Sequence, residues 1–322
     1  MELNKNKVIQ IGFLLVDEFS MIAFASAIEP LRATNRISSQ NIYKWKILSV
    51  DGNPVNSSNG ISIKADSALN ENLHVDILFV CSGLNIQDKA DKSVLGILRK
   101  LSRRGIHLGS LCTASYLLAK AGLLSGRKST IHWENSLSMQ EDFPDLEITN
   151  SLFEIDRDRY SCSGGTSALD LMLNIISENH GVSLAKSVSD QLIHERIRDS
   201  RDYQRMSLRT RLGVSHPKLI FSVAIMEDNL EEPLSQKELS KKVNISLRQL
   251  ERLFKKYLSC SPNQYYLKLR LERSRNLLLQ TSMSILSVAL ASGFVSASHF
   301  SKCYRSFYGT SPRVSRTIEQ SN

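Results

Sequence analysis

The sequence predicts an α/β domain with a doubly wound, mainly parallel sheet, followed by an all-α domain that contains two helix-turn-helix units. Three observations lead to this fold class. Short apolar runs alternate with helical patterns in the first half, and part of the second half repeats at an offset of 50 residues. The third is charge: residues 1–200 hold 21 Lys and Arg against 23 Asp and Glu, whereas residues 201–322 hold 20 against 9.

The first half is read as a sheet covered by helices. Apolar runs predict four buried strands, at Val8–Val16, Trp45–Val50, Val75–Gly83 and Ile106–Cys112. Helical patterns separate or follow them, at Phe19–Asn35, Ser93–Arg103 and Thr113–Leu124. Strands that are apolar nearly throughout and alternate with helices indicate a parallel sheet with both faces covered. Ligands of such sheets bind beyond the carboxyl ends of the strands, which is where Cys112 lies.

The end of the first domain is predicted from turn and helix signals. Two short strands are expected around 148–163, joined at Asp156–Arg159, and a helix then runs to Gly181. A further helix, Val182–Arg198, closes a domain that spans residues 1–198. Residues 199–216 are polar and rich in Arg, so they are predicted to be a linker, and residues 217–322 form the second domain.

The repeat aligns Leu234–Pro262 with Ser284–Pro312 and superimposes their apolar positions. Each copy predicts a short helix, a tight turn and a second helix. Ser235 with Glu238 and Ser246 with Gln249 form capping boxes in the first copy, with the turn at Asn244. In the second copy Gly293 supplies the turn, and Ser296 or Ser298 the cap.

This layout is that of a helix-turn-helix, whose second helix enters the DNA major groove. Asn263 to about Leu279 is predicted to be a helix about 25 Å long that connects the two copies. Such a rod holds two recognition helices near the roughly 34 Å that separates successive major grooves. Double-stranded DNA is therefore the expected partner of the basic domain, and the charge asymmetry agrees.

Gly293–Pro312, GFVSASHFSKCYRSFYGTSP, closely resembles the signature of the AraC/XylS family of transcription regulators, and the resemblance covers about Pro217–Arg316. It implies base-facing positions on the first recognition helix at Arg248, Glu251 and Arg252, with Gln249 beside them. On the second recognition helix it implies Ala297, Ser298 and Lys302, with His299 and Ser301 nearby.

The periodicity of the first recognition helix agrees with this assignment. Leu247, Leu250, Leu253 and Phe254 are expected to be buried, which leaves Arg248, Glu251, Arg252 and Lys255 on the open face. Arg252 is our choice for a base contact, because a guanidinium bridges guanine O6 and N7. Most protein–DNA hydrogen bonds go to the backbone, so phosphate contacts, or a merely solvated face, are expected at Lys255, Lys256, Lys268, Arg270, Arg273 and Arg305.

The first domain resembles the PfpI-type amidotransferase-like fold, and with the second domain it resembles the GlxA-type regulators. Three segments carry this resemblance: FSMIAFASAIEPLR, GSLCTASYLLAKAGLL and TIHWE. In enzymes of this fold a cysteine on a strand-to-helix elbow works with a nearby acid and often a following histidine. Cys112 occupies the elbow, but Thr113 follows it and Ala23 stands where such enzymes carry the acid. We therefore expect no catalysis, although the helix start would lower the pKa of the thiol.

Cys112 is then either a packing residue or part of an effector site. In the second reading the backbone N–H groups of Thr113 and Ala114 receive a carboxylate. Trp133 faces a cationic group, helped by Glu29 or Glu134, with His132 nearby. The alternatives are a core Trp133, a backbone-bonding His132 and a surface Glu29. The resemblance is to the branch that regulates arginine, carnitine or glycine betaine metabolism, which implies an effector of that kind.

The sequence thus predicts a cytoplasmic, soluble, homodimeric transcription regulator that acts as an activator with RNA polymerase and is not an enzyme. Five scattered cysteines without a CxxC pair indicate neither disulfides nor a metal site, and no cofactor is expected. No apolar run is long enough to span a membrane. Two alternatives remain: an amidase or glyoxalase-like enzyme that uses Cys112, and a first domain that serves only for dimerisation.

Overall fold

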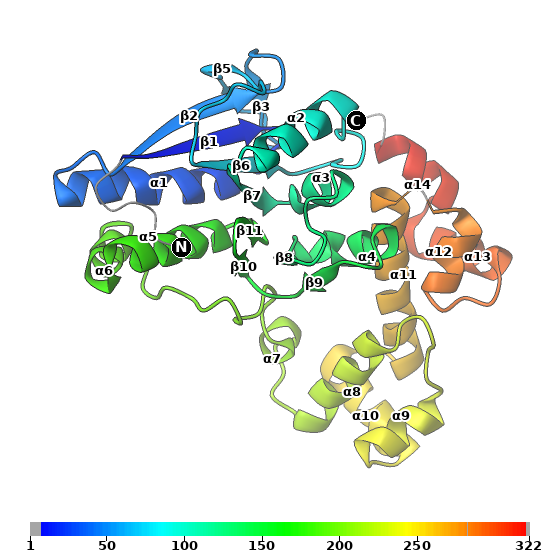
Figure 1. The fold of residues 1–322 in the computed structure, drawn as a ribbon. Helices are drawn as coiled ribbons and strands as arrows, with labels where there is room; N and C mark the ends of the chain where they lie inside the picture. The colour runs from blue at the N-terminus through cyan, green and yellow to red at the C-terminus, as the bar shows by residue number, and fades with distance from the viewer. Residues whose placement is uncertain (1–7, 282, 320–322) are drawn as a thin grey trace. The chain divides into compact units, whose positions relative to one another are not determined.

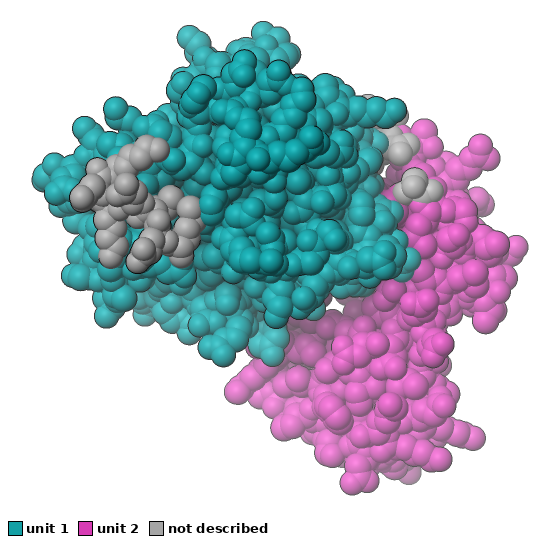
Figure 2. Space-filling view, viewed as in Figure 1, with its two compact units in different colours: residues 1–204 teal, residues 205–322 magenta. Residues whose placement is uncertain are grey.

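The computed structural model of the protein describes residues 8–281 and 283–319. Residues 1–7 and 320–322, at the ends of the two predicted domains, lie outside the described residues. The chain forms two compact units, which Figure 2 colours separately, with the division between Gln204 and Arg205.

The first unit is built on a seven-stranded sheet in the order β10-β11-β7-β6-β1-β2-β5 (Figure 1). Every neighbouring pair is parallel except β10 with β11. The strands are β1 Ile9–Leu15, β2 Tyr43–Ser49, β5 Ser67–Ala68, β6 Ile77–Ser82, β7 His107–Cys112, β10 Phe153–Asp156 and β11 Arg159–Cys162. Smaller ladders pair β3 Val55–Asn56 with β4 Ser62–Ile63, and β8 Lys128–Thr130 with β9 Glu147–Thr149. The predicted mainly parallel sheet is confirmed.

Helices cover both faces of this sheet, as predicted. One face carries α1 Met21–Ser38, α5 Ser167–His180 and α6 Val182–Gln191, and the other carries α2 Lys92–Arg103, α3 Ser115–Lys120 and α4 Trp133–Asp142. Successive side chains of β1 alternate between the two cores: Phe13 and Leu15 pack with α1 and α5, whereas Leu14 and Val16 pack with α2 and α3. This is the period of two that a strand imposes.

Two predicted helices are shorter in the structure. The helix expected at Thr113–Leu124 is α3, only Ser115–Lys120, because the chain turns at Gly122 with a φ of 72°. The helix expected to reach Arg198 ends at Gln191, and Ile193 follows with a φ of 54°. The residues after it are instead drawn onto α5 by hydrogen bonds to the buried carboxylate of Asp170.

The segment after α6 continues along the first unit as far as Gln204. The Leu152 N–H donates to the carbonyl of Ser200 at 2.8 Å, and Tyr203 bridges to Ser151. Six residues of the predicted linker therefore belong to the first unit in the structure, and α7 Leu208–Leu212 forms in the rest of it. The boundaries predicted from the sequence, 1–198 and 217–322, stay predictions.

The second unit is helical and carries the repeat, with α8 Pro217–Asp228, α9 Gln236–Val243, α10 Leu247–Leu258, α11 Pro262–Gln280, α12 Ile285–Ala291, α13 Ala297–Tyr308 and α14 Pro312–Glu319. Both ends of α13 lie 50 residues after those of α10. The capping boxes at Ser235 and Ser246 are present, and Ser296 rather than Ser298 caps α13. Leu250 and Phe254 are buried as predicted, whereas Leu247 is 36% exposed because it begins the helix at its open end.

Candidate functional site

Cys112 ends β7 at the carboxyl edge of the sheet in a conformation that few side chains adopt. Its φ is 64°, in the left-handed region, which costs a residue with a side chain about 1–3 kcal/mol. A Cβ on Gly164 would lie 2.8 Å from the Cβ of Cys112 and 2.9 Å from its sulfur. The chain can therefore pass Cys112 only because position 164 is a glycine. Cys112 is confirmed on a strand-to-helix elbow.

The thiol of Cys112 is 7% exposed and is held in its neutral form. Burial raises its pKa to about 12, and the neighbouring Cys162 adds to the shift. The Thr113 N–H and the Ser20 hydroxyl hydrogen-bond the sulfur and oppose this shift without overcoming it. The expectation of a lowered pKa is wrong, because α3 has only six residues and begins three positions later, too little to outweigh burial.

The backbone donors predicted to receive a carboxylate are engaged inside the unit. The Thr113 N–H bonds the Cys112 sulfur, and the Ala114 N–H donates to the carbonyl of Leu111 at 3.3 Å. The Thr113 hydroxyl donates to the carbonyl of Gly83 at 2.7 Å. Both residues are buried. The physical reason is that the elbow closes on itself as a turn, so its N–H groups find acceptors before any ligand does.

His132 lies beside Cys112, and Trp133 and Glu134 follow it at the start of α4. The His132 N–H donates to the carbonyl of Cys112 at 3.3 Å, and α4 begins at Trp133. The imidazole centroid is 5.7 Å from the Trp133 ring, and its Nδ1 is 3.7 Å from the Glu134 carboxylate. Burial lowers the pKa of His132, against the opposing effect of Glu134. An aromatic ring, a neutral imidazole and a half-exposed carboxylate therefore share this edge.

Glu29 does not join this group. It pairs with Arg32 one turn later on α1, with both side chains about half exposed. At 1.5 Å per residue, Glu29 lies about 12 Å along the helix from the end that contacts Cys112. The structure therefore places Glu29 on the surface of α1, with a partner on the same helix.

Sequence reasoning missed Ser20, Gly83 and Gly164, which complete the surroundings of Cys112. Ser20 caps α1, and its backbone N–H donates to the carbonyl of Ser82 at 3.3 Å. A Cβ on Gly83 would lie 2.3 Å from the carbonyl oxygen of Glu18. The signal was present: Cys-Ser-Gly occurs at 81–83 and again at 162–164, each time where a buried strand ends.

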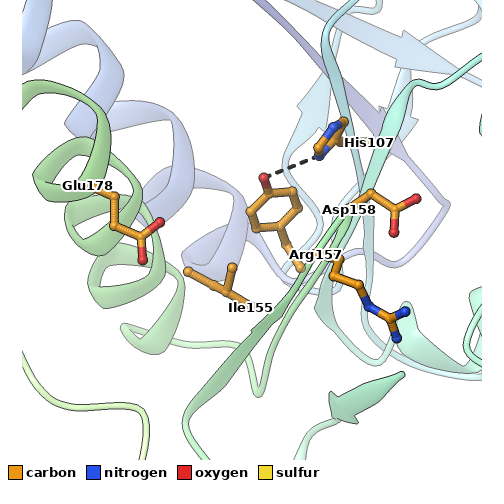
Figure 3. Close-up of a pocket in the computed structure, with 6 residues that line it drawn as sticks. His107, Ile155, Arg157, Asp158 and Glu178 are labelled. Carbon is orange, nitrogen blue, oxygen red and sulfur yellow. Dashed lines mark hydrogen bonds between the residues drawn. The ribbon is translucent and has the colours of Figure 1, made fainter. Parts of the chain in front are cut away.

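A hollow with a volume of about 420 Å³ lies at the opposite, amino edge of the same sheet (Figure 3). Glu178 projects from α5 toward the hairpin that carries Ile155 and Arg157, and the Tyr160 hydroxyl lies 3.3 Å from Nδ1 of His107. Burial lowers the pKa of His107 and raises that of Tyr160 to about 12. Both rings are therefore neutral near pH 7, and this hollow is chemically distinct from the Cys112 edge.

The candidate DNA-binding face of α10 is open to solvent. All six predicted residues of this helix are exposed: Arg248, Gln249, Glu251, Arg252, Lys255 and Lys256. Leu250 and Phe254 anchor the opposite face in the core of the second unit. The amide oxygen of Gln249 accepts from the Ser246 N–H at 2.9 Å, so its NH₂ group is the end directed outward.

The corresponding face of α13 is open but carries fewer charges. Ser298, His299, Lys302 and Arg305 are exposed, whereas Ala297 is half-buried at the helix start. Nε2 of His299 lies 3.4 Å from the sulfur of Cys303, one turn later. In residues 8–281 and 283–319, no group of three or more His, Cys, Asp or Glu side chains is arranged to hold a metal ion. Nor does any helix within those ranges meet the length and hydropathy needed to cross a membrane.

Comparisons with known proteins agree with both halves of the architecture. Residues 10–178 match the DJ-1/PfpI family, and residues 239–317 match a helix-turn-helix domain. A DJ-1-type α/β unit joined to two helix-turn-helix units with open, basic recognition helices defines a DNA-binding transcription regulator.

Full-length relatives narrow the class. The HTH-type transcriptional regulator GbdR of Pseudomonas aeruginosa is 49% identical over 306 residues, which is 95% of this chain and 83% of the relative. GlxA of Rhizobium meliloti is 36% identical over 96% of both chains. A crystal structure of an AraC family regulator from Pseudomonas putida matches 57% of this chain and 99% of its own, with 30% identity and a TM-score of 0.53. The chain belongs to the AraC family of transcription regulators that carry a DJ-1/PfpI-type N-terminal domain.

Proposed function

We propose that the first unit senses a small nitrogenous metabolite at the Cys112 edge, without covalent chemistry, and thereby controls an activator of transcription. The effector class is that of arginine, carnitine and glycine betaine, and it contacts Trp133, His132 and Glu134. The regulator acts in the cytoplasm as a homodimer, together with RNA polymerase. The observation that carries this proposal is the neutral, buried thiol of Cys112 beside His132, whose imidazole lies against the Trp133 ring and near the Glu134 carboxylate.

An aromatic ring and a carboxylate that both lie near one imidazole suit a substituted ammonium group. The face of an indole attracts a cation, and a carboxylate adds an ionic hydrogen-bond acceptor for it. The Thr113 and Ala114 N–H groups are committed internally, so they are not part of the proposed contacts. Cation recognition by Trp133 and Glu134 is therefore the core of the proposed site.

The chain that leaves the first unit is attached directly to this edge. The Gln204 amide donates to Oγ1 of Thr130 at 2.9 Å, to the carbonyl of Ile131 at 3.1 Å and to the carbonyl of Ser151 at 2.9 Å. His132, which follows Ile131 in the chain, donates its N–H to the carbonyl of Cys112. A ligand that displaces the 130–134 segment would therefore act on Gln204, the last residue of the unit. This attachment supports control of the second unit by the effector.

A Cys112-dependent enzyme is the second candidate, because the positive φ of Cys112 is the geometry of a catalytic elbow. With a pKa of about 12, only about one thiol in 10⁴ to 10⁵ is ionised at pH 7.4, against several per cent for an ordinary cysteine. We expect iodoacetamide to alkylate native Cys112 about a thousandfold more slowly than free cysteine. The rate should rise about tenfold for each pH unit from 7 to 10, because the thiolate fraction does so.

Site-resolved mass spectrometry measures this rate, with Cys112→Ser to assign the peptide and urea-unfolded protein to show the unprotected rate. Alkylation of Cys112 in the folded chain as fast as that of glutathione at pH 7.4 would favour the enzyme. No change in the second unit or in DNA affinity is expected from Cys112→Ser.

Effector binding is tested by thermal unfolding of the full chain. Both tryptophans, Trp45 and Trp133, belong to the first unit, so their fluorescence reports its unfolding alone. Arginine, carnitine and glycine betaine are added separately. At about a hundred times its dissociation constant, an effector adds about 2.7 kcal/mol, which raises the unfolding midpoint of a unit of this size by about 5–10 °C.

Two variants locate the site of that shift. Trp133→Leu removes a cation–π contact of about 0.5–2 kcal/mol, so affinity should fall about twofold to thirtyfold. Glu178→Gln, in the hollow at the amino edge, is the matched control and should leave the affinity unchanged. Loss of the shift in Glu178→Gln alone would move the effector to the other edge. If none of the three compounds raises the unfolding midpoint, dimerisation would be left as the role of the first unit.

A further inference from the structure

Helix α11 does more than connect the two helix-turn-helix units, because one of its faces holds parts of both. Its 19 residues span about 28 Å. Tyr266, Arg270 and Arg273 follow one another at spacings of four and three, so they share one face of the helix. Each contacts a segment that belongs to one of the two helix-turn-helix motifs. We call these three residues the α11 clamp.

Arg270 holds the turn of the second helix-turn-helix, between α12 and α13. Its Nε donates to the carbonyl of Ser292 at 2.9 Å, and its terminal nitrogen donates to the carbonyl of Gly293 at 2.7 Å. The guanidinium also lies 4.2 Å from the centroid of Phe294, a ring that is 2% exposed. The phosphate contact expected for Arg270 is at odds with this geometry, since both carbonyls lie within the protein and burial lowers the pKa of the guanidinium.

Tyr266 and Arg273 hold the loop that leads into the first helix-turn-helix. The Tyr266 hydroxyl donates to the carbonyl of Asn229 at 2.5 Å and accepts from the Leu234 N–H at 3.3 Å. Arg273 pairs with Glu231 of the same loop at 3.6 Å. The loop between α8 and α9 is therefore fixed against the same face of α11 that holds the second turn.

The two segments also touch each other. Gly293 has a φ of 75°, and a Cβ there would lie 2.5 Å from Cγ of Pro233 and 2.6 Å from the carbonyl oxygen of Leu230. Backbone therefore packs on backbone where the first loop meets the second turn. This close approach removes the freedom that a single connecting helix would leave between the two helix-turn-helix motifs.

We infer that the α11 clamp, with Gly293, is a specificity determinant that fixes the relative placement of α10 and α13. Through it the chain reads two short DNA segments at one spacing. This inference rests on the DNA-binding function of the family and goes beyond it. The clamp residues act through the placement of the two recognition helices, so they are positioning residues rather than DNA contacts.

Selection from a random double-stranded DNA library with the full chain tests this inference. We expect the wild type to enrich two sequence blocks at a single separation. Arg270→Gln loses the charge-assisted bonds to the second turn, so joint enrichment at that separation should fall about tenfold and spread to neighbouring separations. Each block should still be enriched separately, because α10 and α13 keep their exposed faces.

Three further variants separate placement from folding. Tyr266→Phe removes only the hydroxyl bridge and should broaden the spacing in a chain whose thermal unfolding is little changed. Gly293→Ala introduces the clash with Pro233 and should broaden it more. Lys268→Gln, on the same helix, has an exposed side chain and is the control: affinity should fall at most uniformly, with the spacing unchanged.

The outcomes are distinct. Unchanged spacing between the two blocks in folded Arg270→Gln and Tyr266→Phe would overturn the inference. Loss of one block with the other retained would also overturn it, because the clamp would then serve a single helix-turn-helix. A wild type that enriches one block only would also overturn it. A wild type that enriches no sequence would contradict sequence-specific binding itself.

Discussion

Asp170→Ala is expected to lower the free energy of unfolding of the first unit by about 3–5 kcal/mol, the usual cost of leaving a buried ion pair with one partner. The Asp170 carboxylate is fully buried in the first turn of α5. It accepts from Nε2 of His194 at 3.0 Å and from the backbone N–H and side chain of Arg198 at 2.7 and 2.9 Å. Removing it leaves the Arg198 charge without its partner and releases the segment after α6.

Urea unfolding followed by tryptophan fluorescence measures this loss in the full chain. Asp199→Ala is the matched control, because Asp199 lies in the same segment after α6. It pairs with Arg201, and both side chains are more than half exposed. An exposed pair of this kind contributes little to the free energy of unfolding, so Asp199→Ala should leave it nearly unchanged. A change below about 1 kcal/mol for Asp170→Ala would show that the carboxylate is not a principal anchor of the segment.

Arg252→Ala is expected to weaken binding to the preferred DNA sequence by about 1–3 kcal/mol, or about five- to 150-fold, and to relax base preference at one position. Arg252 is exposed in the middle of α10, and a guanidinium is the side-chain group that bridges guanine O6 and N7. The loss belongs to that base pair alone, so binding to a site with a different base at that position should change little.

Lys256→Ala is the matched comparison, since Lys256 is exposed one turn later on the same helix. As a phosphate contact it should weaken binding to all sequences alike and reduce the slope of log affinity against log salt by about 1. Titrations of both variants on the selected site, a single-base variant and a scrambled site measure these effects. Equal loss on all three DNAs for Arg252→Ala would place Arg252 on the backbone instead.

The helix-turn-helix half of the protein was largely predictable from local sequence. Capping boxes join residues three positions apart, and the amphipathic period of α10 is set within one helix, so Ser235, Ser246 and Leu250 were assigned without tertiary information. Because the segment repeats after 50 residues, the helix and cap signals of the first copy recur in the second. In the α/β half, strands that are buried on both faces were equally visible as apolar runs, and the order of strands and helices followed from them.

Only the tertiary structure decided the chemistry of the sites, because it depends on groups far apart in the chain. Burial beside Cys162 raises the pKa of Cys112, against the local expectation from the helix start. The helix predicted to reach Arg198 ends at Gln191, and Arg198 instead hydrogen-bonds the carboxylate of Asp170, 28 residues earlier in the chain. Arg270 was predicted to contact DNA phosphate, but folding brings the carbonyls of Ser292 and Gly293 within hydrogen-bond distance of its guanidinium. The sequence by itself determined which elements form, since those interactions are local; folding decided which side chains meet, since desolvation and long-range hydrogen bonds exist only in the packed chain.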